Sequence, residues 1–234
     1  MMPILIMDGL QVAFLIIALI FAVLAVKRVH HKKHKKQIML IKQKVFVILI
    51  IAMGLLTIGD IIQHTLAVLG KLGYPSIADA FFAPSYVLFA VAFGYFWYRV
   101  GKIHKLHPKE PVFMFAVACG VFIWLYYLFT LSIIPALPAD CSVRRFLMIF
   151  YPIIVSLMFI LTLKIHPTFR AGLIRTPLWY ISHGVFTHFL GYQMYAYYLW
   201  NSTYSWFPAL YTALYMISAL YFAIGFWAAK KKYK

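Results

Sequence analysis

The residues with the clearest chemical potential lie in the stretch 59–64, where Asp60 precedes His64 by four positions. Asp60 lies deep within an apolar run, and we interpret it as the only carboxylate inside any such run. An ionisable side chain in hydrocarbon costs about 2.5–3.5 kcal/mol on insertion scales, so one that persists there indicates a functional site. Residues three or four apart share a helix face, so Asp60 and His64 form our first candidate for ligand or proton binding.

A later apolar run carries polar residues at a matching depth. With a rise of ~1.5 Å per residue, Asp60 lies roughly 24 Å and His188 roughly 20 Å from the basic ends of their segments. His183 is five residues before His188, so it points to another face and is left out of the site. We therefore predict an outward-facing pocket lined by Asp60, His64, His188, Tyr192, Gln193, Tyr195 and Tyr215.

Two other interpretations of the same residues stay open. One carboxylate and two imidazoles suit zinc or non-haem iron, which makes Asp60, His64 and His188 candidate metal ligands. Zinc-bound water with a pKa of about 7 would then hydrolyse a lipid bond. Alternatively, Asp60 hydrogen-bonds His64 within one helix, and the histidines only join neighbouring helices.

Composition determines the class of protein that must position these residues. The chain has 234 residues, of which 65% are hydrophobic and 19% aromatic, and this excludes a water-soluble globule. The net charge of +17 does not indicate a nucleic-acid partner, because the charges lie in short gaps between apolar runs. We predict an all-α integral membrane protein of the cell membrane.

Apolar runs long enough to cross a bilayer need about 20 residues as helix. The chain, 1–234, is predicted to be a single membrane domain with seven transmembrane helices. The predicted helices span about 3–26, 45–69, 80–98, 111–135, 146–164, 177–200 and 206–229.

The basic residues predict the orientation of this bundle. Nineteen of the 22 Lys and Arg residues lie in 27–44, 99–109, 164–175 and 230–234, and the other three lie on the opposite side. The positive-inside rule then places the N-terminus outside and the C-terminus in the cytoplasm. Asn201 begins a glycosylation triplet in a predicted outer loop, which leaves its modification open.

The joint between the second and third segments carries a recognisable pattern. Gly-Asp at 59–60 is followed by Pro-Ser-Ile-Ala-Asp at 75–79 and by Tyr86. This pattern resembles the multi-pass membrane sensor domains that precede prokaryotic GGDEF cyclases and histidine kinases, and it covers about 30 residues. The resemblance implies a prokaryotic small-molecule sensor and gives functional weight to the matching positions, which are Asp60, Pro75, Ser76, Ala78, Asp79 and Tyr86.

These observations favour a receptor-like or accessory membrane subunit that signals or docks through basic cytoplasmic loops. The predicted partners are anionic lipid headgroups at the cytoplasmic face and a separate membrane or cytoplasmic protein. An intramembrane metal-dependent hydrolase and a structural subunit of a larger complex are the alternatives. Retinal is not expected, because the last helix contains no lysine for a Schiff base.

Overall fold

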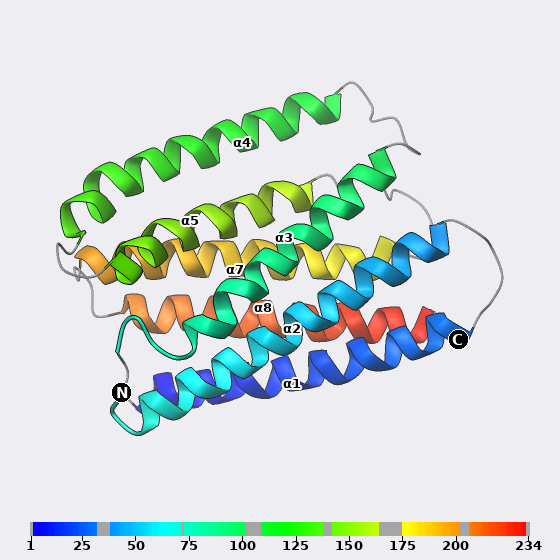
Figure 1. Cartoon of the computed structure of the whole chain (residues 1–234), viewed down its shortest axis with the longest axis horizontal. Helices are drawn as coiled ribbons and strands as arrows, with labels where there is room; N and C mark the ends of the chain where they lie inside the picture. Colours follow the sequence, from blue (N-terminus) through cyan, green and yellow to red (C-terminus); the bar gives the residue numbers. More distant parts are fainter. Residues whose placement is uncertain are drawn as a thin grey trace.

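The computed structural model describes residues 2–31, 38–71, 73–101, 109–137, 142–163, 175–201 and 206–232, and the regular structure in these ranges is helical. α4 continues into a π-helix, Phe129–Ile133, and a 3-10 helix, Ile134–Ala136. Each predicted apolar segment corresponds to one long helix. The α-helices in the described ranges are α1 (Met2–His31), α2 (Ile38–Val68), α3 (Asp79–Gly101), α4 (Lys109–Leu128), α5 (Ser142–Leu163), α7 (Arg175–Asn201) and α8 (Phe207–Lys232) (Figure 1).

Six of these helices are long and apolar enough to cross a membrane, which indicates a multi-pass membrane protein. The exception is α7, which has 27 residues but a less apolar composition than the other six. Ser182, His188 and Gln193 contribute to this difference, and the side chains of these three residues are buried inside the bundle. Of the seven membrane-crossing helices predicted, six are therefore long and apolar enough to cross a membrane.

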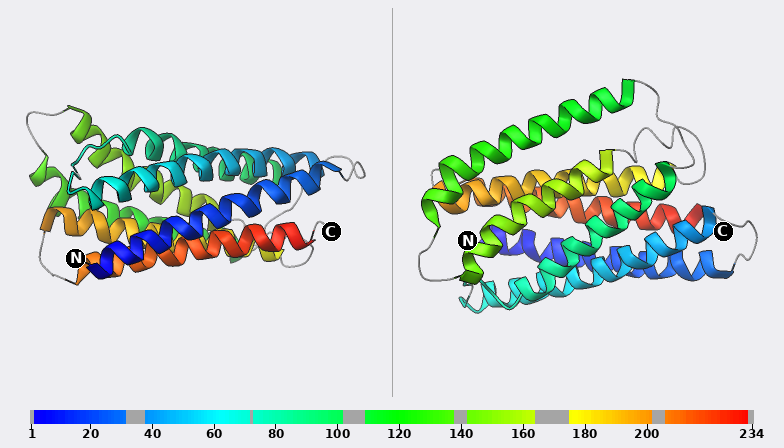
Figure 2. Two further views of the ribbon diagram at one scale, coloured as in Figure 1. Left: turned by 90° about the horizontal axis from the view of Figure 1, so that it is seen from below. Right: turned by 45° about the horizontal axis from the view of Figure 1, so that its top comes forward.

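The helices lie side by side along the long axis of the molecule (Figures 1 and 2). α1 packs along α8 and α2, and α8 also packs along α7. α5 packs against both α3 and α7. The centre of this group is aromatic, with Phe89 and Phe93 of α3 and Phe222 and Phe226 of α8 almost fully buried. α4 lies at the edge of the bundle and contacts α5 (Figure 1).

α7 and α8 approach each other closely because glycines lie at their contact. A Cβ added at Gly191 would lie 3.2 Å from the side chains of Leu214 and Tyr215. On the opposite side of the contact, a Cβ at Gly225 would lie 2.8 Å from Ile181. Small residues allow helix backbones to pack tightly in membranes, and here they hold α7 beside α8 along most of its length.

The start of α3 is held by a capping interaction. The backbone N–H of Ser76 donates a hydrogen bond of 2.7 Å to Oδ2 of Asp79, which lies three residues later in the first turn. This is the acidic half of a capping box, and the negative charge also complements the helix dipole at this end. Asp79 therefore supports the first turn of α3.

The two ends of the bundle differ in which elements meet there. α1 begins, the α2–α3 connection turns, α7 ends and α8 begins at one end, whereas α8 ends at the other (Figure 1). We call the first of these the N-terminal end. Two predicted features lie partly outside the described residues. Of the basic stretch 27–44, residues 32–37 are not described, and of the glycosylation triplet, Ser202 and Thr203 are not described.

Candidate functional site

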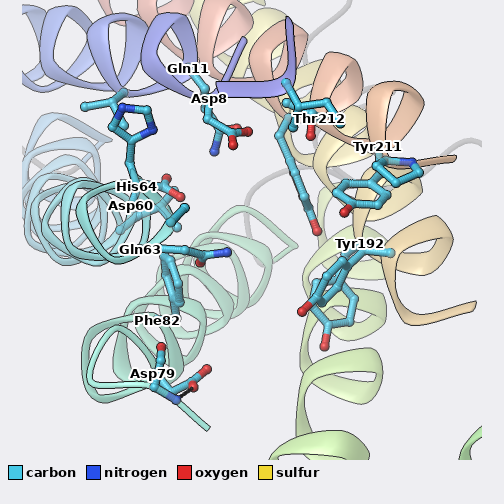
Figure 3. A pocket seen from close by; sticks show the side chains of 18 of the residues that line it. Asp8, Gln11, Asp60, Gln63, His64, Asp79, Phe82, Tyr192, Tyr211 and Thr212 are labelled. Atoms are coloured by element: carbon cyan, nitrogen blue, oxygen red, sulfur yellow. Dashed lines mark hydrogen bonds between the residues drawn. The ribbon is translucent and has the colours of Figure 1, made fainter. Parts of the chain in front are cut away.

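A pocket of about 640 Å³ opens between the helices at the N-terminal end of the bundle. Exposed Gly70 and Gly73 of the α2–α3 connection lie at its rim, and Leu56, Tyr86 and His188 lie deeper in the helices. α1, α2, α3, α5, α7 and α8 all contribute side chains to it. Figure 3 shows polar residues of α1 and α2 on one side of the space and aromatic residues of α7 and α8 across from them.

The polar wall of the pocket is built by α1, α2 and α8. Asp60 of α2 lies within hydrogen-bonding reach of Gln11 on α1, and it is close enough to Asp8 for the two carboxylates to interact electrostatically. Asp8 in turn lies within hydrogen-bonding reach of Thr212 on α8 and interacts electrostatically with His64. This wall therefore directs the Asp8 and Asp60 carboxylates to the same space, with Gln11 and Thr212 as uncharged hydrogen-bonding neighbours and with His64 near Asp8 (Figure 3).

The arrangement corrects the interpretation of Asp60 as the only carboxylate inside an apolar run. Asp8 lies within the membrane-crossing part of α1, 4–26, and faces the same pocket. His64 packs against α1, because a Cβ added at Gly9 would lie 3.8 Å from its ring. The charged group with which His64 interacts electrostatically is the Asp8 carboxylate, also on α1. The buried Nδ1 of His64 has no hydrogen-bond partner among the described residues. Asp60 and His64 thus share a helix face, as predicted, but each has its own partner on α1.

The opposite wall of the pocket is aromatic. Nε2 of His188 and the hydroxyl of Tyr86 are 2.9 Å apart and form a buried hydrogen bond between α7 and α3. The His188 ring also packs on Tyr215, with ring centroids 5.0 Å apart. Tyr151 of α5 packs against both Tyr86 and Tyr192, with centroid distances of 5.6 and 5.8 Å. Six aromatic rings from four helices, including Tyr195, form a continuous surface on this side.

Asp79 is the third carboxylate of the pocket, and both of its oxygens have protein partners. Oδ2 accepts the Ser76 N–H, and Oδ1 accepts a hydrogen bond of 2.7 Å from the Tyr151 hydroxyl. Nearby in the α2–α3 connection, burial raises the pKa of the Tyr74 phenol, and the charge of Asp79 adds to this effect. Asp79 therefore links the start of α3 to α5 through hydrogen bonds to Ser76 and Tyr151.

Six of the seven predicted ligand-binding residues line this one pocket, namely Asp60, His64, His188, Tyr192, Tyr195 and Tyr215. Gln193 faces another part of the bundle. Its Oε1 accepts a hydrogen bond of 3.1 Å from Trp124 Nε1, and its Nε2 donates one of 3.1 Å to Ser156. At ~100° per residue, its neighbour Tyr192 faces the pocket while Gln193 faces α4 and α5. Its inclusion in the pocket was wrong.

His183 lies apart from the pocket, as its spacing from His188 predicted. Its Nδ1 is 2.8 Å from the carbonyl of Trp179, and its ring stacks on the Trp179 ring with centroids 3.8 Å apart. Its ring also packs on Tyr221 of α8, with ring centroids 5.8 Å apart. His183 and His188 therefore belong to different parts of the bundle.

The candidate metal ligands do not converge on one point. Among the described residues, no three His, Cys, Asp or Glu side chains come close enough together to hold a metal ion. His188 uses Nε2 for Tyr86, and Asp60 and His64 face α1 on the opposite wall. The geometry therefore offers a pocket for a molecule and lacks the coordination shell that a catalytic zinc requires.

Sequence reasoning missed the contributions of Asp8, Gln11, Tyr151 and Thr212 to the pocket. Each lies within an apolar segment at the N-terminal end of the bundle, and a search for polar residues at that depth in every segment would have found them. Tyr86 was noted only through the resemblance to sensor domains. Comparison of the chain with family models, with curated proteins and with solved structures returned no match.

Proposed function

We propose that this chain is a receptor-like or accessory membrane subunit that binds a small molecule from the outer side. The pocket at the N-terminal end of the bundle carries this proposal. Its volume of about 640 Å³ lies within the ~300–1,000 Å³ typical of small-molecule sites. Its lining also has the usual composition of such sites, a mostly aromatic wall with a few polar groups.

The orientation of the pocket follows from the charge distribution. In the sequence, nineteen of 22 basic residues fall in 27–44, 99–109, 164–175 and 230–234, the stretches that join or follow the helix ends opposite the pocket. Lys71, Arg144 and Arg145 fall instead near the α2–α3 connection and the start of α5, on the pocket side (Figure 1). The positive-inside rule therefore favours an outer position for the pocket and the N-terminus, and a cytoplasmic position for the C-terminus.

We further propose that α7 is the seventh membrane-crossing helix. It packs along α8 throughout the bundle, and its 27 residues are about as long as the 26 of α8. Neighbouring helices surround its polar residues Ser182, His188 and Gln193, so these groups are not exposed to lipid. The C-terminus and the N-terminus then lie on opposite sides of the membrane.

Binding would be communicated through the opposite end of the bundle. Tyr86 and His188 connect α3 with α7 directly below the pocket, so a ligand that displaces either side chain changes the packing of both helices. Both helices lead to basic segments on the predicted cytoplasmic side, in 99–109 and 164–175. Basic loops at that face suit an acidic partner protein or anionic headgroups. The resemblance to membrane sensor domains supports the same function.

Cysteine labelling tests the orientation and the access to the pocket. After Cys119 and Cys141 are replaced by serine, a membrane-impermeant maleimide in sealed cells should label Gly73→Cys. Gly73 is exposed at the rim, and a Cβ there meets no atom within 4 Å. Lys44→Cys, exposed near the other end of α2, is the matched control and should react only after permeabilisation. Labelling of Lys44→Cys and protection of Gly73→Cys would refute the proposed function.

Metal analysis and subunit analysis test the two alternatives. A hydrolase would contain zinc or iron in stoichiometric amount, and His188→Ala would remove it. The Tyr86–His188 hydrogen bond predicts the opposite result, a metal content that does not depend on His188. A structural subunit would instead purify in fixed stoichiometry with other chains, whatever ligand is present.

A further inference from the structure

We propose that the pocket is selective for an organic cation, a small molecule with an ammonium group and an apolar body. The ammonium would lie beside Asp8 and Asp60, and the apolar body would lie against Tyr86, Tyr192 and Tyr215. This inference rests on the proposed function, because it assigns a ligand class to the same pocket.

The first argument is the distribution of charge. The whole protein has 22 basic and only five acidic residues. Three of these five acids, Asp8, Asp60 and Asp79, line the pocket, whereas its lining contains no lysine or arginine among the described residues. In a chain of net charge +17, this is a local concentration of negative charge opposite to the overall balance. A low-dielectric cleft lined by one sign of charge attracts ligands of the other sign.

The second argument separates the three acids by what they already bind. Asp79 accepts hydrogen bonds from Ser76 and Tyr151, so it is committed to the fold. Asp8 and Asp60 interact with each other unfavourably as like charges, and their hydrogen-bonding neighbours Gln11 and Thr212 are uncharged. His64 interacts electrostatically with Asp8 but is not a neighbour of this kind for Asp60.

An ammonium group between Asp8 and Asp60 would offset their repulsion and donate to both, since charge-assisted hydrogen bonds are the strong ones. His64 lines the same pocket, and its buried Nδ1 lacks a partner among the described residues. In the tautomer that is protonated at Nε2, this nitrogen is a further acceptor.

The third argument concerns size and the aromatic wall. An inorganic cation would need several oxygen or nitrogen ligands close around it, and the described residues provide no such cluster of His, Cys, Asp or Glu. The pocket volume of about 640 Å³ instead fits a molecule of many atoms. Tyrosine faces attract cations as well as apolar groups, which suits a ligand with both. Tyr86 and Tyr215 present such rings on either side of His188, at centroid distances of 5.4 and 5.0 Å.

The test compares three probes of nearly equal shape and different charge. Binding of 2-phenylethylammonium, uncharged 2-phenylethanol and anionic phenylacetate would be measured by calorimetry on the full chain in lipid nanodiscs. Wild-type protein should bind the ammonium most tightly of the three. This comparison needs no variant, so it is independent of how well any variant folds.

Variants then locate the charge recognition. Asp8→Asn and Asp60→Asn should each weaken ammonium binding by about tenfold or more, because each removes a charged hydrogen-bond acceptor. Neither should change the affinity for 2-phenylethanol. Glu110→Gln, at the start of α4, removes the same charge from a helix that contributes no described residue to the pocket, and it should leave ammonium affinity unchanged. Thermal unfolding of each variant verifies that it is folded.

Several outcomes would overturn the inference. Equal or tighter binding of the alcohol or the carboxylate, stabilisation by sodium chloride alone, or unchanged ammonium affinity in both asparagine variants would each refute cation selectivity. Absence of binding by all three probes would refute it as well. None of these results would refute the proposed function. That function fails if Gly73→Cys is inaccessible from outside, if the bound species proves to be a catalytic metal, or if the chain purifies in fixed stoichiometry with other chains as a structural subunit.

Discussion

The close approach of α2 to α3 at Gly59 makes a testable prediction about the support of the pocket. A Cβ at Gly59 would lie 2.6 and 2.7 Å from Cε1 and Cδ1 of Phe82, well inside van der Waals contact. The Phe82 ring is largely buried and stacks on Tyr86, with centroids 6.4 Å apart and planes inclined by 17°. Tyr86 is in turn bonded to His188. Gly59→Ala must therefore displace a ring that supports the pocket wall.

The magnitude follows from two opposing terms. Overpacking a well-packed core costs about 1–3 kcal/mol, whereas alanine is favoured over glycine in a helix by about 1 kcal/mol. Gly120→Ala provides the control, because Gly120 is also inside a helix and a Cβ there meets no atom within 4 Å. The propensity term is common to both variants and cancels in their difference. Gly59→Ala should therefore be less stable than Gly120→Ala by about 1–3 kcal/mol.

The assay is reversible unfolding in mixed micelles by added SDS, followed by tryptophan fluorescence. Phe82→Leu, alone and combined with Gly59→Ala, completes a double-mutant cycle. The smaller side chain should remove much of the penalty, so the two substitutions should be non-additive by about 0.5–3 kcal/mol. Equal stability of the two glycine variants, or additivity in the cycle, would show that α2 and α3 do not meet as described.

Two further predictions concern hydrogen bonds between helices. Tyr86→Phe and His188→Ala should be non-additive in unfolding free energy by ~0.6 kcal/mol, with an upper value of ~1.7 kcal/mol, as for other buried interhelical hydrogen bonds in membranes. Strict additivity would mean that this bond is not formed. Asp79→Ala should destabilise the protein by about 1–3 kcal/mol, because it leaves the Ser76 N–H and the Tyr151 hydroxyl without their acceptor. Tyr151→Phe removes one of these bonds and should cost only about 0.5–1.5 kcal/mol in the same SDS-unfolding assay, so an equal loss in both variants would contradict the dual role of Asp79.

The positions of the helices could be predicted from the sequence because a bilayer requires long apolar segments. The predicted segment 80–98 corresponds to α3 at Asp79–Gly101, and 206–229 corresponds to α8 at Phe207–Lys232. α7 shows where this reasoning weakens, because a helix packed against other helices can carry buried polar groups such as His188, and its hydropathy is then too low for the criterion.

The pocket could be predicted only in part. The spacing of residues along the sequence shows which of them share a face of one helix, but it does not show which helices pack against each other. Asp60 with His64, and His188 with Tyr192, were grouped correctly from their spacing. The partners of Asp60 and His64 come from α1, and the packing of α1 between α2 and α8 cannot be read from any single segment. Depth alone was also insufficient, as Gln193 shows.

The packing of α1 along α8 has a consequence for biosynthesis. α1 is translated long before α8, yet Asp8 finds its hydrogen-bonding neighbour Thr212 only on α8. Contacts between segments so distant in sequence form late, because the chain between them must first lose conformational entropy before the contacts can stabilise it. The pocket is thus completed only after α8 has been inserted. A nascent chain that stalls before Phe207 lacks Thr212, so it leaves the Asp8 carboxylate at membrane depth without this hydrogen-bonding neighbour.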